Sequence, residues 1–347
     1  MKTTTIAIDL AKSVFEVGIS YHPGHVAQTH RLSRKELAEF MAAQPGASVI
    51  MEACGSCHYW GRKFQSFGHE VKLLPPRAVR PYVQRSKTDR ADVKGMLEAS
   101  RNTDIHPVPV KSESQQQLTA LHRVRSGWIQ TRTMRLNCAR GLLAELGIVF
   151  PKGSTAAAGR ILGILEDAEM ALPPAIREVL HQLVLEIGEL ETRIAAVVKQ
   201  LEALASETPL VERLQTIPGI GPISSTALAG FIGDASRFRS SRQFACYLGL
   251  TPREHSSGSR RQLGRISKQG DPYLRRLLVQ GANAVLTWAD RKPNPDRFRS
   301  WAIEVMERRG RRKAAVAVAN KIARLVWAIW TSGKPYQSVN PTPLSTD

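Results

Sequence analysis

The sequence predicts an α/β domain at its N-terminus and a mainly helical remainder. Three observations predict this layout. Short apolar runs alternate with amphipathic segments over the first hundred residues, an unbroken heptad pattern follows near the middle, and the last third repeats apolar residues at helical spacing. We expect domains over 1–110, 111–208 and 209–335 and a flexible tail over 336–347.

The N-terminal elements follow from local patterns. Apolar runs bounded by turn residues predict strands at 4–9, 14–19, 26–31, 47–52 and 69–74. Ser33 followed by Glu36 forms a capping box and begins a helix, and two further helices are expected at 58–67 and 87–101. Three antiparallel strands followed by alternating helices and strands are typical of an α/β fold.

Charge is the most unusual bulk property of the chain. It contains 49 Lys and Arg against 30 Asp and Glu, a net charge of +19. Basic and acidic residues number 15 and 10 in 1–110, 11 and 11 in 111–208, and 23 and 9 in 209–347. An excess concentrated in the last part predicts a nucleic-acid partner, and a basic surface without a binding role is the alternative.

No segment predicts a signal peptide or a membrane span. Asp9 and Lys12 interrupt the first apolar run, and Lys321 and Arg324 interrupt the apolar stretch from Ala314 to Trp330. We expect a cytoplasmic protein with no membrane partner.

Four carboxylates are the candidate catalytic residues of the first domain. Asp9 and Glu52 each end an apolar strand, where α/β sheets bind ligands, and Asp89 and Asp92 lie one turn apart on a helix. Each of these acids, taken alone, could equally be an ordinary turn or surface residue. Together they would repel one another unless a divalent cation joined them, so the set predicts Mg²⁺, with Mn²⁺ possible.

The sequence Cys54-Gly-Ser-Cys57-His58 has the spacing of a redox dithiol, half a zinc site or a haem attachment site. A structural zinc requires four ligands, and the other two cysteines, Cys138 and Cys246, have no partner at ligand spacing. We interpret the spacing as accidental and assign the chemistry of this stretch to Glu52.

Three segments carry a family resemblance: "IAIDLAKSVFEV", "IMEACGS" and "SKTDRADVKGML". They resemble the acidic blocks of DEDD-type insertion-sequence transposases, whose N-terminal domain is RNase H-like and close to that of RuvC. The resemblance implies that Asp9, Glu52, Asp89 and Asp92 bind the metal. It also implies a DNA recombinase that works as a dimer or tetramer joined by a coiled coil, on donor and target DNA chosen by a structured guide (bridge) RNA.

The middle domain contains a basic helix followed by a heptad segment. Residues 112–147 predict a helix whose candidate nucleic-acid contacts are Arg123 and Arg132, with a solvated face as the alternative. Apolar residues then follow strict 4–3 spacing from Ile176 to Leu204, which predicts a coiled coil. We favour contact with a partner chain, and antiparallel pairing with the basic helix is the competing interpretation.

The C-terminal domain contains a turn and a loop that could contact phosphates. Pro218-Gly219-Ile220-Gly221 matches a helix-hairpin-helix, in which Gly219 and Gly221 let the backbone approach a phosphate; an ordinary helix turn is the alternative. The loop or ribbon that follows, rich in Ser, Gly and Arg, offers four further nucleic-acid contacts: Arg260, Arg261, Arg265 and Lys268.

The segment "GLTPREHSSGSRRQLGRISKQG" resembles the C-terminal signature of the same transposases. The resemblance implies that Ser257, just before Gly258, is a nucleophile that forms a covalent phosphoserine with DNA. The neighbouring Ser256 and Ser259 leave the position open by one or two residues. Two alternatives remain: a Holliday-junction-type nuclease that uses Mg²⁺ and water, and a nucleic-acid-binding scaffold without catalysis.

Overall fold

The computed structural model describes residues 4–22, 25–83, 88–149, 157–167, 169–258, 260–289 and 296–338. Two compact units form, Met1–Gln116 and Gln117–Asp347. Ser259 and the tail residues 339–347 lie outside the described ranges. The sequence-based boundary at 208/209 falls inside the second unit.

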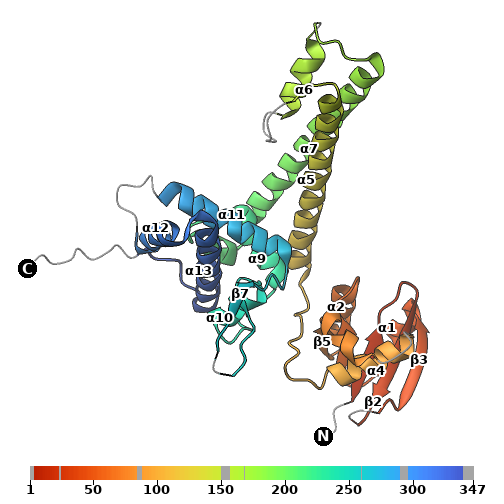
Figure 1. The fold of residues 1–347 in the computed structure, drawn as a ribbon. Coiled ribbons are helices and arrows are strands. Elements are labelled where there is room, and N and C mark those ends of the chain that lie inside the picture. Colours follow the sequence, from red (N-terminus) through yellow and green to blue (C-terminus); the bar gives the residue numbers. More distant parts are fainter. Residues whose placement is uncertain are drawn as a thin grey trace, which may run out of the picture. The chain divides into compact units, whose positions relative to one another are not determined.

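The first unit is built on a mixed five-stranded sheet (Figure 1). Its strands are β1 (Thr5–Asp9), β2 (Val14–Ser20), β3 (Gln28–Ser33), β4 (Ser48–Glu52) and β5 (Glu70–Leu74). Its helices are α1 (Arg34–Ala43), α2 (Cys57–Ser66), α3 (Pro76–Val79), the 3₁₀ turn Arg80–Tyr82 and α4 (Asp89–Ala99). The strand order β3-β2-β1-β4-β5, with β1, β4 and β5 parallel, confirms the expected α/β class and agrees with an RNase H-like domain.

Alternation along β1 explains how both faces of the sheet are covered. Ile6 and Ile8 belong to a buried cluster with residues of α1 and α2, whereas Ala7 belongs to a second cluster with residues of α4. At Gly18 on β2, an added Cβ would lie 2.4 Å from Cγ1 of Val93 on α4. The missing side chain therefore lets α4 pack closely on the sheet.

The start of α1 confirms the predicted capping box. The Ser33 backbone N–H donates to the Glu36 carboxylate at 2.7 Å, and the Glu36 N–H donates to the Ser33 hydroxyl at 3.4 Å. Hydrogen bonds to the Glu36 carboxylate from the Ser33 backbone, and then from the Ser33 side chain, hold the pKa of Glu36 below its ordinary value.

The second unit is mainly helical and contains a short two-stranded ribbon. Helix α5 (Glu113–Glu145) leads into it from the end of the first unit, followed by α6 (Ala157–Glu166), α7 (Pro174–Ser206), α8 (Pro209–Gln215), α9 (Pro222–Ile232) and α10 (Ser241–Tyr247). The ribbon consists of β6 (Pro252–Glu254) and β7 (Leu263–Ile266), and α11 (Pro272–Ala289), α12 (Arg297–Arg309) and α13 (Arg311–Ser332) complete the unit.

Helices α5 and α7 pack against each other as an antiparallel pair. Near one end, Leu118 shares a buried cluster with Val197 and Leu201, and near the other, Leu143 shares one with Leu180. The predicted heptad seam of α7 is thus filled from within the same chain. This corrects our preference for a partner chain on this seam, because a heptad pattern requires only that some helix cover its apolar stripe.

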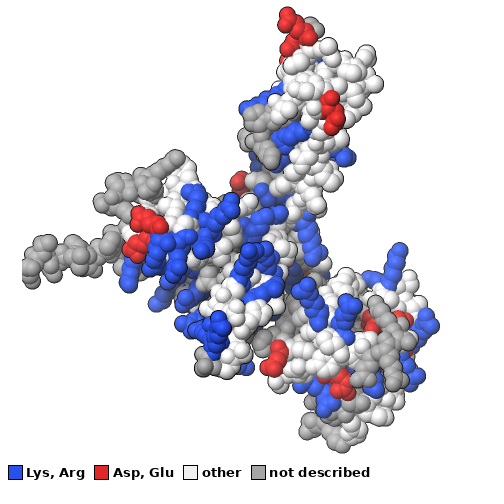
Figure 2. All heavy atoms as spheres, viewed as in Figure 1, with Lys and Arg blue, Asp and Glu red and all other residues white. Residues whose placement is uncertain are grey.

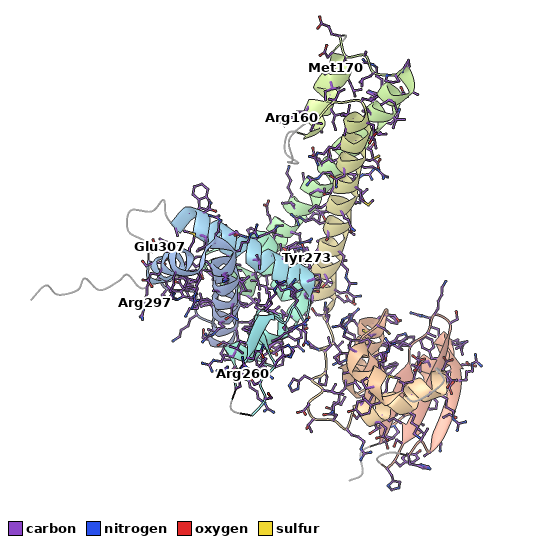
Figure 3. All side chains as sticks on the ribbon, viewed as in Figure 1. Arg160, Met170, Arg260, Tyr273, Arg297 and Glu307 are labelled. Atoms are coloured by element: carbon purple, nitrogen blue, oxygen red, sulfur yellow. The ribbon has the colours of Figure 1, made fainter. Side chains whose placement is uncertain are left out.

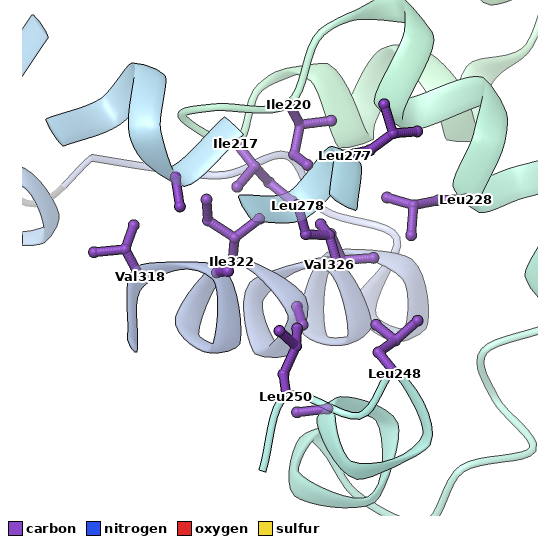
Figure 4. Close-up of a cluster of buried hydrophobic side chains, with 14 of the residues drawn as sticks. Ile217, Ile220, Leu228, Leu248, Leu250, Leu277, Leu278, Val318, Ile322 and Val326 are labelled. Carbon is purple, nitrogen blue, oxygen red and sulfur yellow. The ribbon is translucent and has the colours of Figure 1, made fainter. Parts of the chain in front are cut away.

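The core of the second unit surrounds α13. Figure 4 shows its central side chains, which come from α9, α11, α13 and the segments between α8 and α9 and after α10. In the described residues α13 is the one helix long and apolar enough to cross a membrane. Its residues Val318, Ile322 and Val326 are fully buried in this core, as expected of a central helix in a folded domain.

Candidate active site

Two of the predicted acids end neighbouring parallel strands. Asp9 is the last residue of β1 and Glu52 the last of β4, and the residues just before them, Ile8 and Met51, are paired across the sheet. Both carboxylates therefore lie at the same edge. Burial is the largest cause that raises the pKa of the Cys54 thiol. The negative charges of Glu52 and then Asp9 are the next largest causes.

The other two acids begin α4, which packs on β1, β2 and β4. Asp89 and Asp92 occupy its first turn, and the Thr88 hydroxyl caps the helix by accepting from the Ala91 N–H at 3.2 Å. A helix N-terminus favours negative charge, which alone can account for acids at these positions. Across the described ranges, no three Asp, Glu, His or Cys side chains are grouped closely enough to hold a metal ion. The structure thus brings Asp9 and Glu52 to one edge and places Asp89 and Asp92 on the covering helix.

The chemistry of this donor set matches a hard cation. All four candidates are carboxylates, the ligands that Mg²⁺ and Mn²⁺ prefer. The Cys57 thiol fits a softer metal poorly, because burial raises its pKa to about 11 and it is buried in the core at the start of α2.

Packing explains one of the two glycines in the turn between α8 and α9. Gly219 has φ +86°, and an added Cβ would lie 2.7 Å from the carbonyl oxygen of Gly281 on α11. Gly221, the residue just before α9, has an extended backbone, and an added Cβ there would have no heavy atom within 4 Å. Contact with α11 therefore accounts for Gly219 without a phosphate, and the open side of the turn is at Gly221.

The predicted loop after α10 forms the ribbon of β6 and β7. Beyond these strands, Ser257 and Arg260 exchange backbone hydrogen bonds of 3.3 and 3.2 Å around a turn in which Gly258 has φ +56°. The Ser256 hydroxyl donates to Glu254 at 2.7 Å and accepts from the Gln262 N–H at 3.3 Å. The exposed Ser257 hydroxyl makes no hydrogen bond to another described residue.

The four predicted basic contacts of this region are exposed. Arg260, labelled in Figure 3, lies at the tip of the ribbon. Arg261 is held 3.4 Å from the Glu254 carboxylate, whereas Arg265 lies on β7. Lys268 has φ +55° in the turn after β7. Figure 2 shows Lys and Arg gathered on the visible face of the second unit, as the charge distribution predicts.

The two predicted contacts on α5 differ in what they do. Arg123 is exposed, but Arg132 lies 3.7 Å from Glu191 on α7, and the neighbouring Arg135 bonds to Glu186 at 2.6 Å. Arg132 therefore contributes to the helix pair. The sequence could not separate the two roles because the acidic partners are more than fifty residues away.

A buried polar network that sequence reasoning missed joins α5 to α9 and α11. His122 is fully buried; its Nδ1 lies 2.9 Å from the Tyr273 hydroxyl and its Nε2 lies 3.0 Å from the Thr226 hydroxyl. Thr226 donates its own proton to the Pro222 carbonyl at 2.6 Å, so Nε2 of His122 carries the hydrogen and Nδ1 accepts from Tyr273. The signal in the sequence is the position of His122, one turn after Leu118 on the apolar face.

An α/β unit with carboxylates at adjacent strand ends, followed by a strongly basic helical unit, defines an enzyme class that acts on phosphodiesters of nucleic acids. A model of IS110-type DEDD transposases matches residues 6–148, and one described as "Transposase IS116/IS110/IS902 family" matches residues 211–299. The chain belongs to this family of DNA transposases.

Full-length relatives agree with the family models. The chain is 42% identical to a "Probable family 20 transposase" of Pseudomonas aeruginosa, over 95% of this chain and 97% of the relative. It is 34% identical to the "Transposase for insertion sequence element IS1111A" of Coxiella burnetii, over 96% and 91%. A "Pilin gene-inverting protein" of Moraxella lacunata is 26% identical over 97% and 98%.

Proposed function

We propose that this transposase cuts and rejoins DNA through a covalent bond between Ser257 and a DNA phosphate. The observation that carries the proposal is the exposure of Ser257 at the end of a basic ribbon, next to Arg260. Ser256 is already bonded to Glu254 and Gln262, which favours Ser257 as the hydroxyl presented to DNA.

The chemistry requires an attack and its reversal. The Ser257 oxygen forms a bond to phosphorus, its proton passes to a base or water, and the bond from phosphorus to one ester oxygen of the strand breaks. This releases a DNA hydroxyl and leaves phosphoserine. The hydroxyl of another strand then attacks the same phosphorus, displaces the serine oxygen and completes the exchange. Arg260 and Arg265 neutralise neighbouring phosphates.

By the donor chemistry described above, Asp9 and Glu52 at the shared sheet edge would hold Mg²⁺ or Mn²⁺. Asp89 and Asp92 would join them only after side-chain movement, because no three such side chains are grouped for a metal in the described residues. A bound divalent cation polarises phosphoryl oxygens and stabilises the charge that develops on them. Asp9 and Glu52 are the last residues of two paired parallel strands, so both carboxylates are attached to rigid backbone.

The partners proposed are donor and target DNA, a structured guide RNA, and further copies of the chain. The net charge of +19 supports a polyanionic partner, and the exposed Arg123 offers one contact. A homo-oligomer would allow Ser257 of one chain to serve the acids of another. Sequencing the nucleic acid that copurifies with the protein tests the RNA: one discrete structured species is expected, and only random fragments would contradict it.

The nucleophile is tested by trapping the adduct. The substrate is end-labelled DNA spanning one end of the insertion sequence that encodes the chain, and SDS electrophoresis reports protein-bound label. Ser257→Ala should abolish both adduct and strand exchange, whereas the matched control Ser256→Ala should keep the adduct. Asp9→Asn should bind DNA without cutting it. Cleavage by Ser257→Ala at the wild-type rate would instead support hydrolysis by water.

A further inference from the structure

A groove on the second unit passes along both sides of Trp301. One cavity of about 460 Å³ lies between α12, α13 and the segment after α13, and a second of about 440 Å³ lies between α13 and the ribbon. Trp301 and Lys321 line both cavities, so the two meet at these side chains. We name the two cavities together the Trp301 groove. Each has the size of a site for a small organic group such as a nucleotide.

Aromatic rings form much of the first cavity. Phe298, Trp301 and Tyr336 line it, and the rings of Phe298 and Trp301 are stacked at 6.2 Å between centroids with an angle of 23°. Phe298 is buried while Trp301 is half-buried, so the inner ring supports the outer one. A supported ring with an accessible face is the surface on which nucleic-acid bases stack without regard to sequence.

The charged residues of the groove are all cationic. Arg297 and Lys321 line the first cavity, and Lys313, Lys321 and Arg324 line the second. Among the described residues that line either cavity, none is Asp or Glu. Stacking rings combined with Lys and Arg select an anionic ligand that carries flat rings, which is the composition of a nucleic-acid strand.

The groove reaches the ribbon that carries the candidate nucleophile. The second cavity is lined by Pro252 and Ile266, which face each other across the ribbon. The same ribbon carries Ser257 beyond the end of β6. A strand that lies in the groove therefore contacts the base of the element that presents the serine.

We propose that the Trp301 groove binds unpaired nucleotides of the DNA strand next to the point of exchange. Bases stack on Trp301, and their phosphates contact Lys321 and its neighbours. The bases must be unpaired because the faces of stacked base pairs in a duplex are covered. The proposal rests on the proposed function for the choice of DNA as the occupant; the aromatic and cationic composition of the groove stands without it.

Fluorescence anisotropy of the full-length protein tests the proposal. The probes are a labelled oligothymidylate of about 15 nucleotides, the matching duplex and the matching oligouridylate. Loss of one stacked base should make Trp301→Ala bind oligothymidylate at least about fivefold more weakly, with duplex affinity changed less than about twofold. Trp301→Phe should restore most of the affinity. Trp288→Ala, which removes a 59% exposed indole outside the groove, is the matched control and should bind as wild type.

Lys321→Ala provides a second variant, because Lys321 is exposed and its loss should not disturb folding. It should reduce the slope of log affinity against log salt for the single strand by about 0.7. Equal losses on single strand and duplex, or no loss in either variant, would overturn the proposal. Tighter wild-type binding of oligouridylate would overturn DNA as the occupant. Asp9→Asn should bind oligothymidylate normally, so failure of the groove and failure of the proposed chemistry are distinguishable.

Discussion

Acidification should weaken the second unit through His122. Its burial, together with the charge of Arg125, lowers the pKa of His122 from 6.5 to about 4. Both hydroxyls that contact the ring nitrogens, those of Tyr273 and Thr226, are arranged for the neutral form. Between these two pKa values the unfolded chain binds a proton that the folded chain does not.

The sign and size of the effect follow from this difference. The free energy of unfolding contributed by His122 is fully present above pH 6.5 and is lost as the pH falls toward 4. Each pH unit is worth about 1.4 kcal/mol, so about 2.5 kcal/mol should be lost by pH 4.5.

Urea unfolding followed by tryptophan fluorescence measures this loss. Five of the six tryptophans lie in the second unit, so the signal reports mainly on it. His122→Gln, which cannot titrate at this position, is the control. Subtracting its pH dependence from that of the wild type removes the contributions of other titrating groups to the free energy of unfolding. The wild-type protein should lose about 2.5 kcal/mol more than the variant between pH 7.5 and 4.5. An equal pH dependence in both proteins would refute the assignment of a neutral, buried imidazole.

Two pairs of substitutions test packing through thermal unfolding. Gly219→Ala should lower the free energy of unfolding by about 2 kcal/mol or more, because the backbone has φ +86° and the new Cβ would meet the Gly281 carbonyl. Gly221→Ala should lower it by about 1 kcal/mol or less. Equal effects of the two substitutions would contradict the packing argument. Leu180→Ala should lower the free energy of unfolding by about 2–5 kcal/mol because the side chain is fully buried between α5 and α7. Leu185→Ala, at a side chain 52% exposed on α7, should change it by about 0.5 kcal/mol or less, and a large effect there would indicate a partner on this face.

Local elements of the first unit were predictable because their signals are local. Ser33 and Glu36 are three residues apart, and the apolar runs ending at Asp9 and Glu52 mark buried strands directly. Adjacency of these two strands required the sheet topology, which the sequence suggested through alternating helices and strands. The short helix α3 was missed because four residues carry too little periodicity to be recognised.

The second unit shows that the residue pattern within one helix cannot predict which other segment packs against it. Most heptad positions of α7 are buried as predicted, whereas Ile176, Leu183 and Leu204 are half-buried. The pattern says nothing about which helix covers them. The same limit applies to Gly219, whose need for a small residue arises from Gly281, more than sixty positions later. For the ribbon, only the structure separates Ser256, which bonds Glu254, from Ser257, which does not.

The self-contained pairing of α5 and α7 makes the length of this arm adjustable. Each helix has 33 residues, so the arm is about 50 Å long at 1.5 Å per residue. Inserting seven residues into both helices would extend it by about 10 Å and preserve the facing of its seam. The length of the α5–α7 pair could therefore change at its distal end without changing the structure of the ribbon, which lies at the other end of the unit.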